Sequence, residues 1–161
     1  MKPIGLSVKN NTGYLNNHNL CDLAKKYQTP LYIVDNKQLV KNINDYLVNF
    51  KSNLFKTSVV YASKAFITYE FCKYIKQFDL MMDAVSLGDM YIAQKAGFDL
   101  NRLVLHGNNK SCEELAFAIK NQVGLVVVDN YYELTKIIKL TNQLETKISI
   151  LLSINIWINS Q

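Results

Sequence analysis

The sequence predicts an α/β fold built around a parallel β-sheet. Short apolar runs rich in β-branched and aromatic residues, typical of buried strands, alternate with segments whose apolar residues recur at helical spacing. From Ser58 onward these runs recur every twenty-odd residues, which accommodates one strand, one helix and two loops. Such a repeating array forms an open doubly wound sheet or a (β/α) barrel, and this pattern alone leaves both open.

The predicted strands are short and the predicted helices have recognisable ends. Ser111 and Glu114 form a capping box that starts a helix ending near Asn121, and a helix over 87–96 stops at Gly97, a natural left-handed cap. An apolar stripe predicts another helix over 38–50. The strands are predicted at PLYIV (30–34), SVVYA (58–62), LMMDAV (80–85), RLVLH (102–106), LVVVD (125–129) and ISILLSI (148–154).

Composition excludes several classes of protein. The 161 residues, 49% of them apolar, predict one globular core without a second independent domain. No apolar run reaches the roughly 18 residues of a membrane span, and the amino terminus is too polar for a secretory signal, so we expect a cytoplasmic protein without membrane contact.

The charged residues, cysteines and histidines argue against several kinds of partner and site. The net charge of +5 comes from scattered lysines and one arginine, Arg102, which argues against a nucleic-acid partner. The three cysteines form no CxxC pair and there are only two histidines, so neither a disulfide frame nor a metal site is expected. No GxGxxG follows a strand, which argues against a Rossmann nucleotide site.

Polar residues follow the predicted strands where each strand ends. Because the carboxyl ends of parallel strands meet at one edge, where such folds keep their sites, we expect these residues to converge. They are Ser63 and Lys64, Asp83 and Ser86, the run His106 to Lys110, and Asp129 with Asn130.

Asp83 and Lys64 carry the chemical hypothesis. Asp83 lies within the apolar run MMDAV, and a buried charge costs several kcal/mol unless it is paired. A buried Lys64 facing it is one partner, and a lysine in a dry pocket can condense with an aldehyde as a Schiff base. The alternatives are that Asp83 binds backbone amides at the strand end and that Lys64 is a surface lysine starting a loop.

Five segments carry a family resemblance. TPLYIVD, YASKAF, MDAVSLGDMYIAQKAGF, HGNNKS and VVVDNYYEL, between about Leu20 and Asn155, resemble the amino-terminal part of the diaminopimelate decarboxylase family of fold-type-III pyridoxal-phosphate enzymes. HGNNK is the most specific, because it separates this family from ornithine and arginine decarboxylase relatives. The resemblance implies a Schiff-base role for Lys64, a cofactor contact for Asp83, a pocket wall at His106, and a substrate rim at Ser86, Asn108 and Asn109.

The resemblance also implies an architecture. It implies an incomplete (β/α)8 TIM-type barrel of the alanine-racemase-like family, with about five of the eight strands. Residues 1–36 would hold a helix and, at 30–34, one strand of a β domain that is otherwise absent; residues 37–161 would form the partial barrel. The intact family member is expected to be a homodimer.

The sequence departs from the family at two places. The family's Ser-Gly-Gly-Glu-Leu pattern reads Ser86-Leu87-Gly88-Asp89-Met90 here, and its Arg-Ile-x-Pro-Gly pattern is replaced by a run beginning at Ser153. The second change removes an arginine from the implied site. The phosphate bed, the acid for the ring nitrogen and the proton donor are expected in the family's later segments.

The function implied is pyridoxal-phosphate-dependent decarboxylation of meso-diaminopimelate to L-lysine, a step of lysine biosynthesis, as the activity of the intact family member. The alternative is a truncated remnant, or one half of a split gene, without catalysis of its own. A pyridoxal-phosphate carrier resembling single-domain barrel proteins is a third reading.

Overall fold

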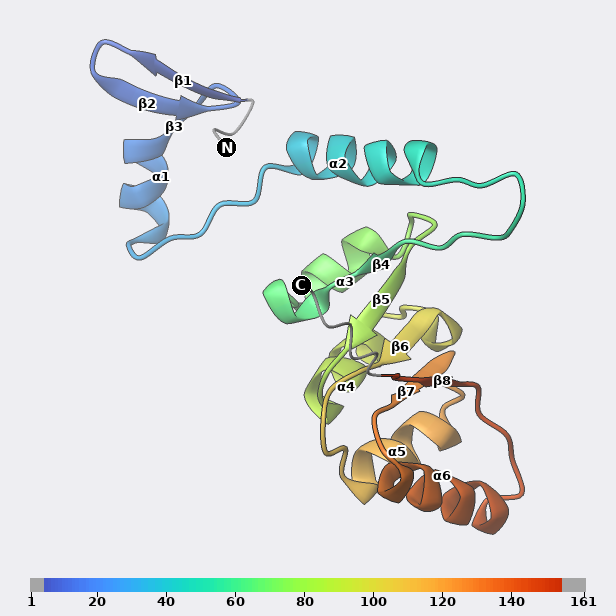
Figure 1. Ribbon diagram of the computed structural model, residues 1–161. Helices are drawn as coiled ribbons and strands as arrows, with labels where there is room; N and C mark the ends of the chain where they lie inside the picture. The colour runs from blue at the N-terminus through green and yellow to red at the C-terminus, as the bar shows by residue number, and fades with distance from the viewer. Residues whose placement is uncertain (1–4, 155–161) are drawn as a thin grey trace, which may run out of the picture. The chain divides into compact units, whose positions relative to one another are not determined.

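A computed structural model describes residues 5–154 of the chain (Figure 1). The chain divides into two compact units, with the boundary between Thr57 and Ser58. The sequence predicts one globular core, and among residues 5–154 all the buried apolar side chains except Ile43 lie in the second unit.

The amino-terminal unit opens with an antiparallel sheet in the order β1 (Leu6–Lys9), β2 (Thr12–Leu15) and β3 (His18–Asn19). Two-residue turns join the strands, and both turns consist of asparagines with positive φ: 48° and 56° at Asn10 and Asn11, and 46° and 70° at Asn16 and Asn17. Two successive left-handed residues make the tight hairpin turn that matches strand twist, and asparagine tolerates this conformation. None of the predicted strands falls in this segment.

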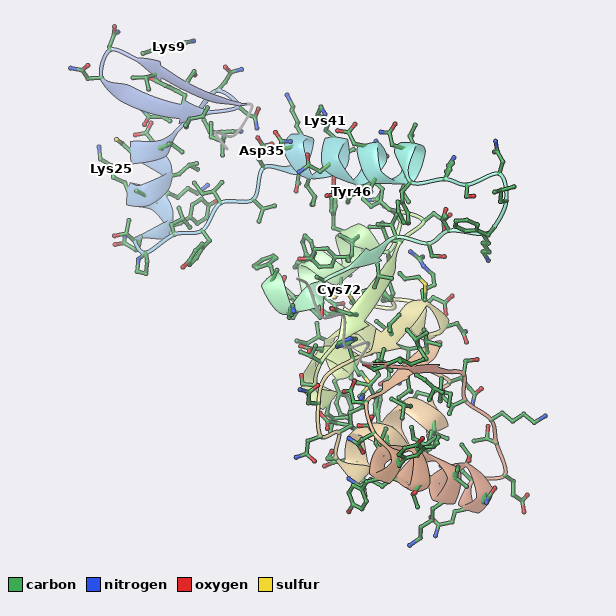
Figure 2. The ribbon with its side chains drawn as sticks, viewed as in Figure 1. Lys9, Lys25, Asp35, Lys41, Tyr46 and Cys72 are labelled. Carbon is green, nitrogen blue, oxygen red and sulfur yellow. The ribbon has the colours of Figure 1, made fainter. Side chains whose placement is uncertain are left out.

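Two helices follow the sheet. Asn19 caps α1 (Leu20–Tyr27), and Asp35 caps α2 (Asn36–Asn49), where its carboxylate accepts from the amides of Lys37 and Gln38 at 3.0 and 3.2 Å (Figure 2). This α2 is the helix predicted over 38–50, and its stripe buries Ile43.

The strand predicted at 30–34 is wrong for the described residues. No strand is present between α1 and α2, and Leu31, Tyr32, Ile33 and Val34 are all exposed. The apolar, β-branched composition favours a strand, but a strand also needs a hydrogen-bonded neighbour, and this segment has none within residues 5–154.

The carboxyl-terminal unit contains a five-stranded parallel sheet in the order β4-β5-β6-β7-β8. Every strand lies within a predicted run: β4 (Val60–Tyr61), β5 (Met81–Ala84), β6 (Leu103–Leu105), β7 (Leu125–Val128) and β8 (Ile150–Leu152). Spatial order follows chain order with no reversal, whereas a doubly wound sheet reverses direction at a switch point. The topology therefore favours a segment of a (β/α) barrel.

Helices connect the strands and neighbour one another in chain order (Figure 1). They are α3 (Tyr69–Ile75), α4 (Leu87–Lys95), α5 (Cys112–Lys120) and α6 (Tyr131–Gln143). The predicted capping box at Ser111 and Glu114 is present, and Gly97 has a φ of 68° after α4, as predicted. These features confirm the helix limits read from sequence.

The core lies between the central strands and the helices. Strand β6 is buried at every residue because it has two strands on each side, whereas all of β8 is exposed at the sheet edge. Arg102 closes the turn before β5: its guanidinium donates to the carbonyls of Lys76, Phe78 and Leu80. Within residues 5–154, no helix has the length and apolar content that crossing a membrane requires.

Gly124, just before β7, is required by close packing. A Cβ placed there would collide with the backbone carbonyl of Asn101, which cannot rotate away. We expect Gly124→Ala to lower the free energy of unfolding by about 1–3 kcal/mol, the usual cost of overpacking. Thermal and urea unfolding followed by circular dichroism measure this change.

Gly88→Ala is the matched control, because it adds the same methyl group within α4. The nearest atom there is Ser86 Oγ at 3.6 Å, an ordinary contact. Replacing a helical glycine by alanine should raise stability by up to about 1 kcal/mol. Equal effects of the two substitutions would contradict the packing at Gly124.

Candidate active site

The carboxyl ends of the parallel strands meet at one edge of the carboxyl-terminal unit, and the predicted site residues lie along this edge. Lys64 follows β4, Ser86 follows β5, and the run from His106 to Lys110 follows β6, while Asp83 is the third residue of β5. Backbone bonds tie the neighbouring ends together: the amide of His106 donates to the carbonyl of Ala84 at 2.8 Å. The predicted convergence is therefore present.

Lys64 lies in a one-turn 3₁₀ helix, Ser63–Ala65, that is braced on both sides. On one side the amide of Ser63 donates to Asp83 Oδ1 at 2.5 Å, and on the other the Tyr61 hydroxyl donates to the carbonyl of Phe66 at 2.7 Å. The rings of Tyr61 and Phe66 both pack against Phe71, with centroids 5.2 and 5.1 Å away. The backbone that carries Lys64 is thus fixed from both ends.

The expected ion pair between Lys64 and Asp83 is absent from the described residues, so that interpretation was wrong. Lys64 is exposed and has no carboxylate of residues 5–154 within ion-pair distance, while Asp83 accepts a backbone amide. This is the alternative in which the acid binds backbone at a strand end. The amide lies next to the carboxylate and costs no side-chain entropy to position, whereas the lysine side chain reaches into solvent.

Two nearby groups keep their protons. Burial raises the pKa of the Tyr61 phenol above its usual value, and Asp83 and then Cys72 raise it further, so the phenol remains a donor to Phe66. Burial, followed by the charge of Asp89, also raises the pKa of Cys72, which lies on α3 (Figure 2). A buried thiol held in this form is inert.

Ser86 and Asp89 build the start of α4. Ser86 Oγ accepts from the amide of Asp89 at 3.2 Å, and Asp89 Oδ2 accepts from the amide of Val85 at 3.0 Å. Asp89, one methylene shorter than the glutamate of the resembling pattern, therefore still closes the turn after β5. Leu87 is the first residue of the helix.

The side chains of His106, Asn108 and Asn109 are exposed on the loop between β6 and α5. Ser153, at the end of β8, borders a hollow of about 520 Å³ together with Asp129 and Asn130. No cluster of residues suited to a metal ion occurs among residues 5–154.

Lys110 is the site-edge residue whose environment the sequence did not reveal. Lys110 is the last residue of the HGNNK run, yet its side chain is only 2% exposed. Its Nζ lies 3.0 Å from Oε2 of Glu133, whose side chain is 3% exposed. A signal was present: Asn130 and Glu133 have the spacing of a helix cap and its partner three residues on, as in the Ser111–Glu114 box.

Lys64 thus lies on a braced turn next to Asp83, at the carboxyl edge of a parallel sheet whose strands follow chain order, as in a (β/α) barrel. Comparison of sequences identifies the family. The chain belongs to the pyridoxal-dependent decarboxylases, because the pyridoxal binding domain of that family matches residues 40–160.

Curated relatives agree with this assignment. The chain is 38% identical over 133 residues to diaminopimelate decarboxylase of Bacillus methanolicus, which covers 83% of this chain and 31% of the relative. The enzyme of the same name from Bacillus subtilis is 39% identical over 132 residues, covering 82% of this chain and 30% of the relative. The chain thus spans about a third of the length of these relatives.

Solved structures show the same fold. Diaminopimelate decarboxylase of M. jannaschii superposes with a TM-score of 0.86 at 26% identity, covering 93% of this chain and 36% of that one. The Helicobacter pylori enzyme, solved in complex with L-lysine, gives 0.68 at 28% identity over 83% of this chain and 34% of that one. The sheet is therefore part of the predicted (β/α) barrel.

The brace at Asp83 generates a prediction. Asp83→Ala should leave the Ser63 amide without its acceptor and speed its hydrogen exchange, at a cost of about 1–3 kcal/mol in stability. Asp83→Asn keeps a carbonyl oxygen at the same place and should retain most of the protection. Amide exchange measured by mass spectrometry tests both, and equal protection at Ser63 in all three proteins would show that Asp83 does not hold the turn.

Proposed function

We propose that this chain supplies the lysine-bearing part of a pyridoxal-phosphate-dependent decarboxylase that converts meso-diaminopimelate to L-lysine. The main observation behind this proposal is that Lys64 is exposed on a braced turn at the carboxyl edge of the barrel. The chain that carries it belongs to the pyridoxal-dependent decarboxylase family. The curated relatives that bear the name diaminopimelate decarboxylase support the choice of substrate.

The residues present fit the cofactor. Lys64 has an accessible side chain without an ion pair in the described part of the chain, as covalent attachment to an aldehyde requires. Bound pyridoxal phosphate supplies the electron sink that stabilises the charge left by CO2 loss. Asp83 orients the lysine turn and places a negative charge beside it, and His106, two strands away, provides a flat side chain for one wall.

The rim residues fit a zwitterionic substrate end. The far end of diaminopimelate carries an ammonium and a carboxylate together, and each asparagine amide offers both a donor and an acceptor without net charge. Asn108 and Asn109 are exposed at this edge, and the hydroxyl of Ser86 adds a further polar group. A substrate with only a distal cation, such as ornithine, would favour carboxylates there instead.

The remaining parts of the proposal concern the whole protein. We propose that the barrel begins at residue 37 and that the intact protein is a cytoplasmic homodimer without nucleic-acid or membrane partners.

Lys64 should be the attachment point of the cofactor. In the complete protein that contains these residues, borohydride reduction after addition of pyridoxal phosphate should fix the pyridoxyl group on Lys64. Peptide mapping locates it, and Lys64→Ala should abolish it. Lys56→Ala, an exposed lysine before β4, is the control and should leave labelling intact. A reduced adduct on another lysine in the unsubstituted protein would refute this role.

Diaminopimelate should be the preferred substrate of the same complete protein. We expect faster CO2 release from diaminopimelate than from ornithine, arginine or lysine, because the Asn108 and Asn109 amides suit a zwitterionic end. Replacing both asparagines with alanine should narrow this preference while leaving pyridoxal phosphate labelling of Lys64 unchanged. Higher turnover on ornithine by the unsubstituted protein would show that the loop does not select diaminopimelate.

A further inference from the structure

Lys110 is a buried lysine to which the proposed reaction assigns no task. Its ammonium donates to the carbonyl of Gly107 at 2.7 Å and to Glu133 Oε2 at 3.0 Å, and it lies 4.0 Å from Asp129 Oδ2. These partners come from its own loop, from α6 and from the end of β7. We call Lys110, Asp129 and Glu133 the Lys110 cluster.

Glu133 connects two strand-to-helix loops. Its Oε1 accepts from the amide of Lys110 at 3.3 Å, in the loop after β6, and its Oε2 accepts from the amide of Asp129 at 3.2 Å, in the loop after β7. Asn130 Oδ1 in turn accepts from the amide of Glu133 at 2.9 Å, which fixes the carboxylate at the start of α6. One side chain therefore sets the distance between the two loops.

The loop held by the cluster has an unusual backbone. Gly107 has a φ of 102° and Asn109 a φ of 53°, both in the left-handed region that most side chains avoid. The Gly107 carbonyl turns inward to the Lys110 ammonium instead of to solvent. Without the bond from Lys110, the Gly107 carbonyl would point inward with no hydrogen-bond donor. The shape of the loop therefore depends on the cluster.

The desolvation cost of the buried Lys110–Glu133 pair indicates that the cluster is present to bond the backbone groups of the two loops. A buried ion pair seldom stabilises a fold more than well-packed apolar side chains would, because desolvation offsets the attraction. Here an apolar pair would leave the Gly107 carbonyl and the amides of Lys110 and Asp129 without their present partners. The Lys110–Glu133 pair bonds to backbone groups of both loops at once.

We infer that Lys110 is a positioning residue: through Gly107 and Glu133 it sets the conformation of the loop 106–109 and so the places of His106, Asn108 and Asn109. It acts on the substrate through these residues and not by contact. That the loop meets substrate rests on the proposed function; that Lys110 shapes the loop rests on the hydrogen bonds alone.

Nuclear magnetic resonance of the 161-residue chain tests the inference without cofactor. The chain has two histidines, so the imidazole signals of His106, in the loop, and His18, in β3, can be assigned by substitution of either one. Lys110→Met should shift the His106 signals of the folded protein and leave those of His18 in place. Lys139→Met, the same change at an exposed site on α6, should move neither.

The outcomes separate positioning from stabilisation. A lower thermal midpoint for Lys110→Met with His106 signals at their original positions would mean that Lys110 only stabilises the unit, and would overturn the inference. If Lys110→Met does not fold, the same His106 signals are measured in Glu133→Gln. This substitution removes the charge of the carboxylate but keeps its shape. Unshifted His106 signals in that variant would equally overturn it.

A kinetic measurement extends the test to substrate. In the complete protein, Lys110→Met should raise KM for diaminopimelate about fivefold to tenfold, the loss of about one hydrogen bond, with a smaller effect on kcat. Borohydride labelling of Lys64 should persist. If the complete protein does not decarboxylate diaminopimelate, the proposed function fails, while the His106 signals still decide the role of Lys110.

Discussion

The candidate site depends on one recurring interaction, a carboxylate that accepts backbone N–H groups where a strand passes into its loop. Asp83 binds the amide of Ser63, Asp89 binds that of Val85, and Glu133 binds those of Lys110 and Asp129. Hydrogen bonds to a charged acceptor are about twice as strong as neutral ones. Each of these bonds fixes a turn that would otherwise have several conformations.

These carboxylates also favour the helices that follow. Asp89 and Glu133 lie in the first turns of α4 and α6, where the positive end of the helix dipole stabilises negative charge. The same side chain thus orders the loop before the helix and the helix itself. Consequently short-range contacts within the carboxyl-terminal unit organise the site edge.

Sequence predicted most of the barrel segment because its signals are local and repeated. Hydrophobic runs at regular spacing located all five parallel strands, and the Ser111–Glu114 spacing located a helix start. The hairpins at Asn10–Asn11 and Asn16–Asn17 were missed, although paired asparagines between short alternating segments are a turn signal. The strand at 30–34 was wrong because pairing depends on a partner that composition does not specify.

Side-chain partners were harder to predict than positions. Asp83, Lys64, His106, Asn108 and Asn109 all lie at the predicted edge, but sequence spacing could not tell that Asp83 binds the Ser63 amide and not Lys64. Both partners follow the same strand, one residue apart, so the pattern of apolar runs does not distinguish them. Glu133 was missed for a related reason: it is 23 residues from Lys110 and meets it only because β6 and β7 are parallel neighbours.

Two lysines at this edge occupy opposite environments, and they differ in how accessible the side-chain nitrogen is. Lys110 is buried, and its nitrogen is held by a carboxylate and a carbonyl at 3.0 and 2.7 Å, so an aldehyde cannot approach it. Lys64 is exposed, while hydrogen bonds at Ser63 and Phe66 hold the backbone on both sides of it. A nucleophile needs this combination of an accessible nitrogen on a fixed base, because accessibility permits the reaction and rigidity directs its product toward one place. The ammonium of Lys110 is therefore held by its own loop and by α6, and Lys64 is the amine that we propose for the cofactor.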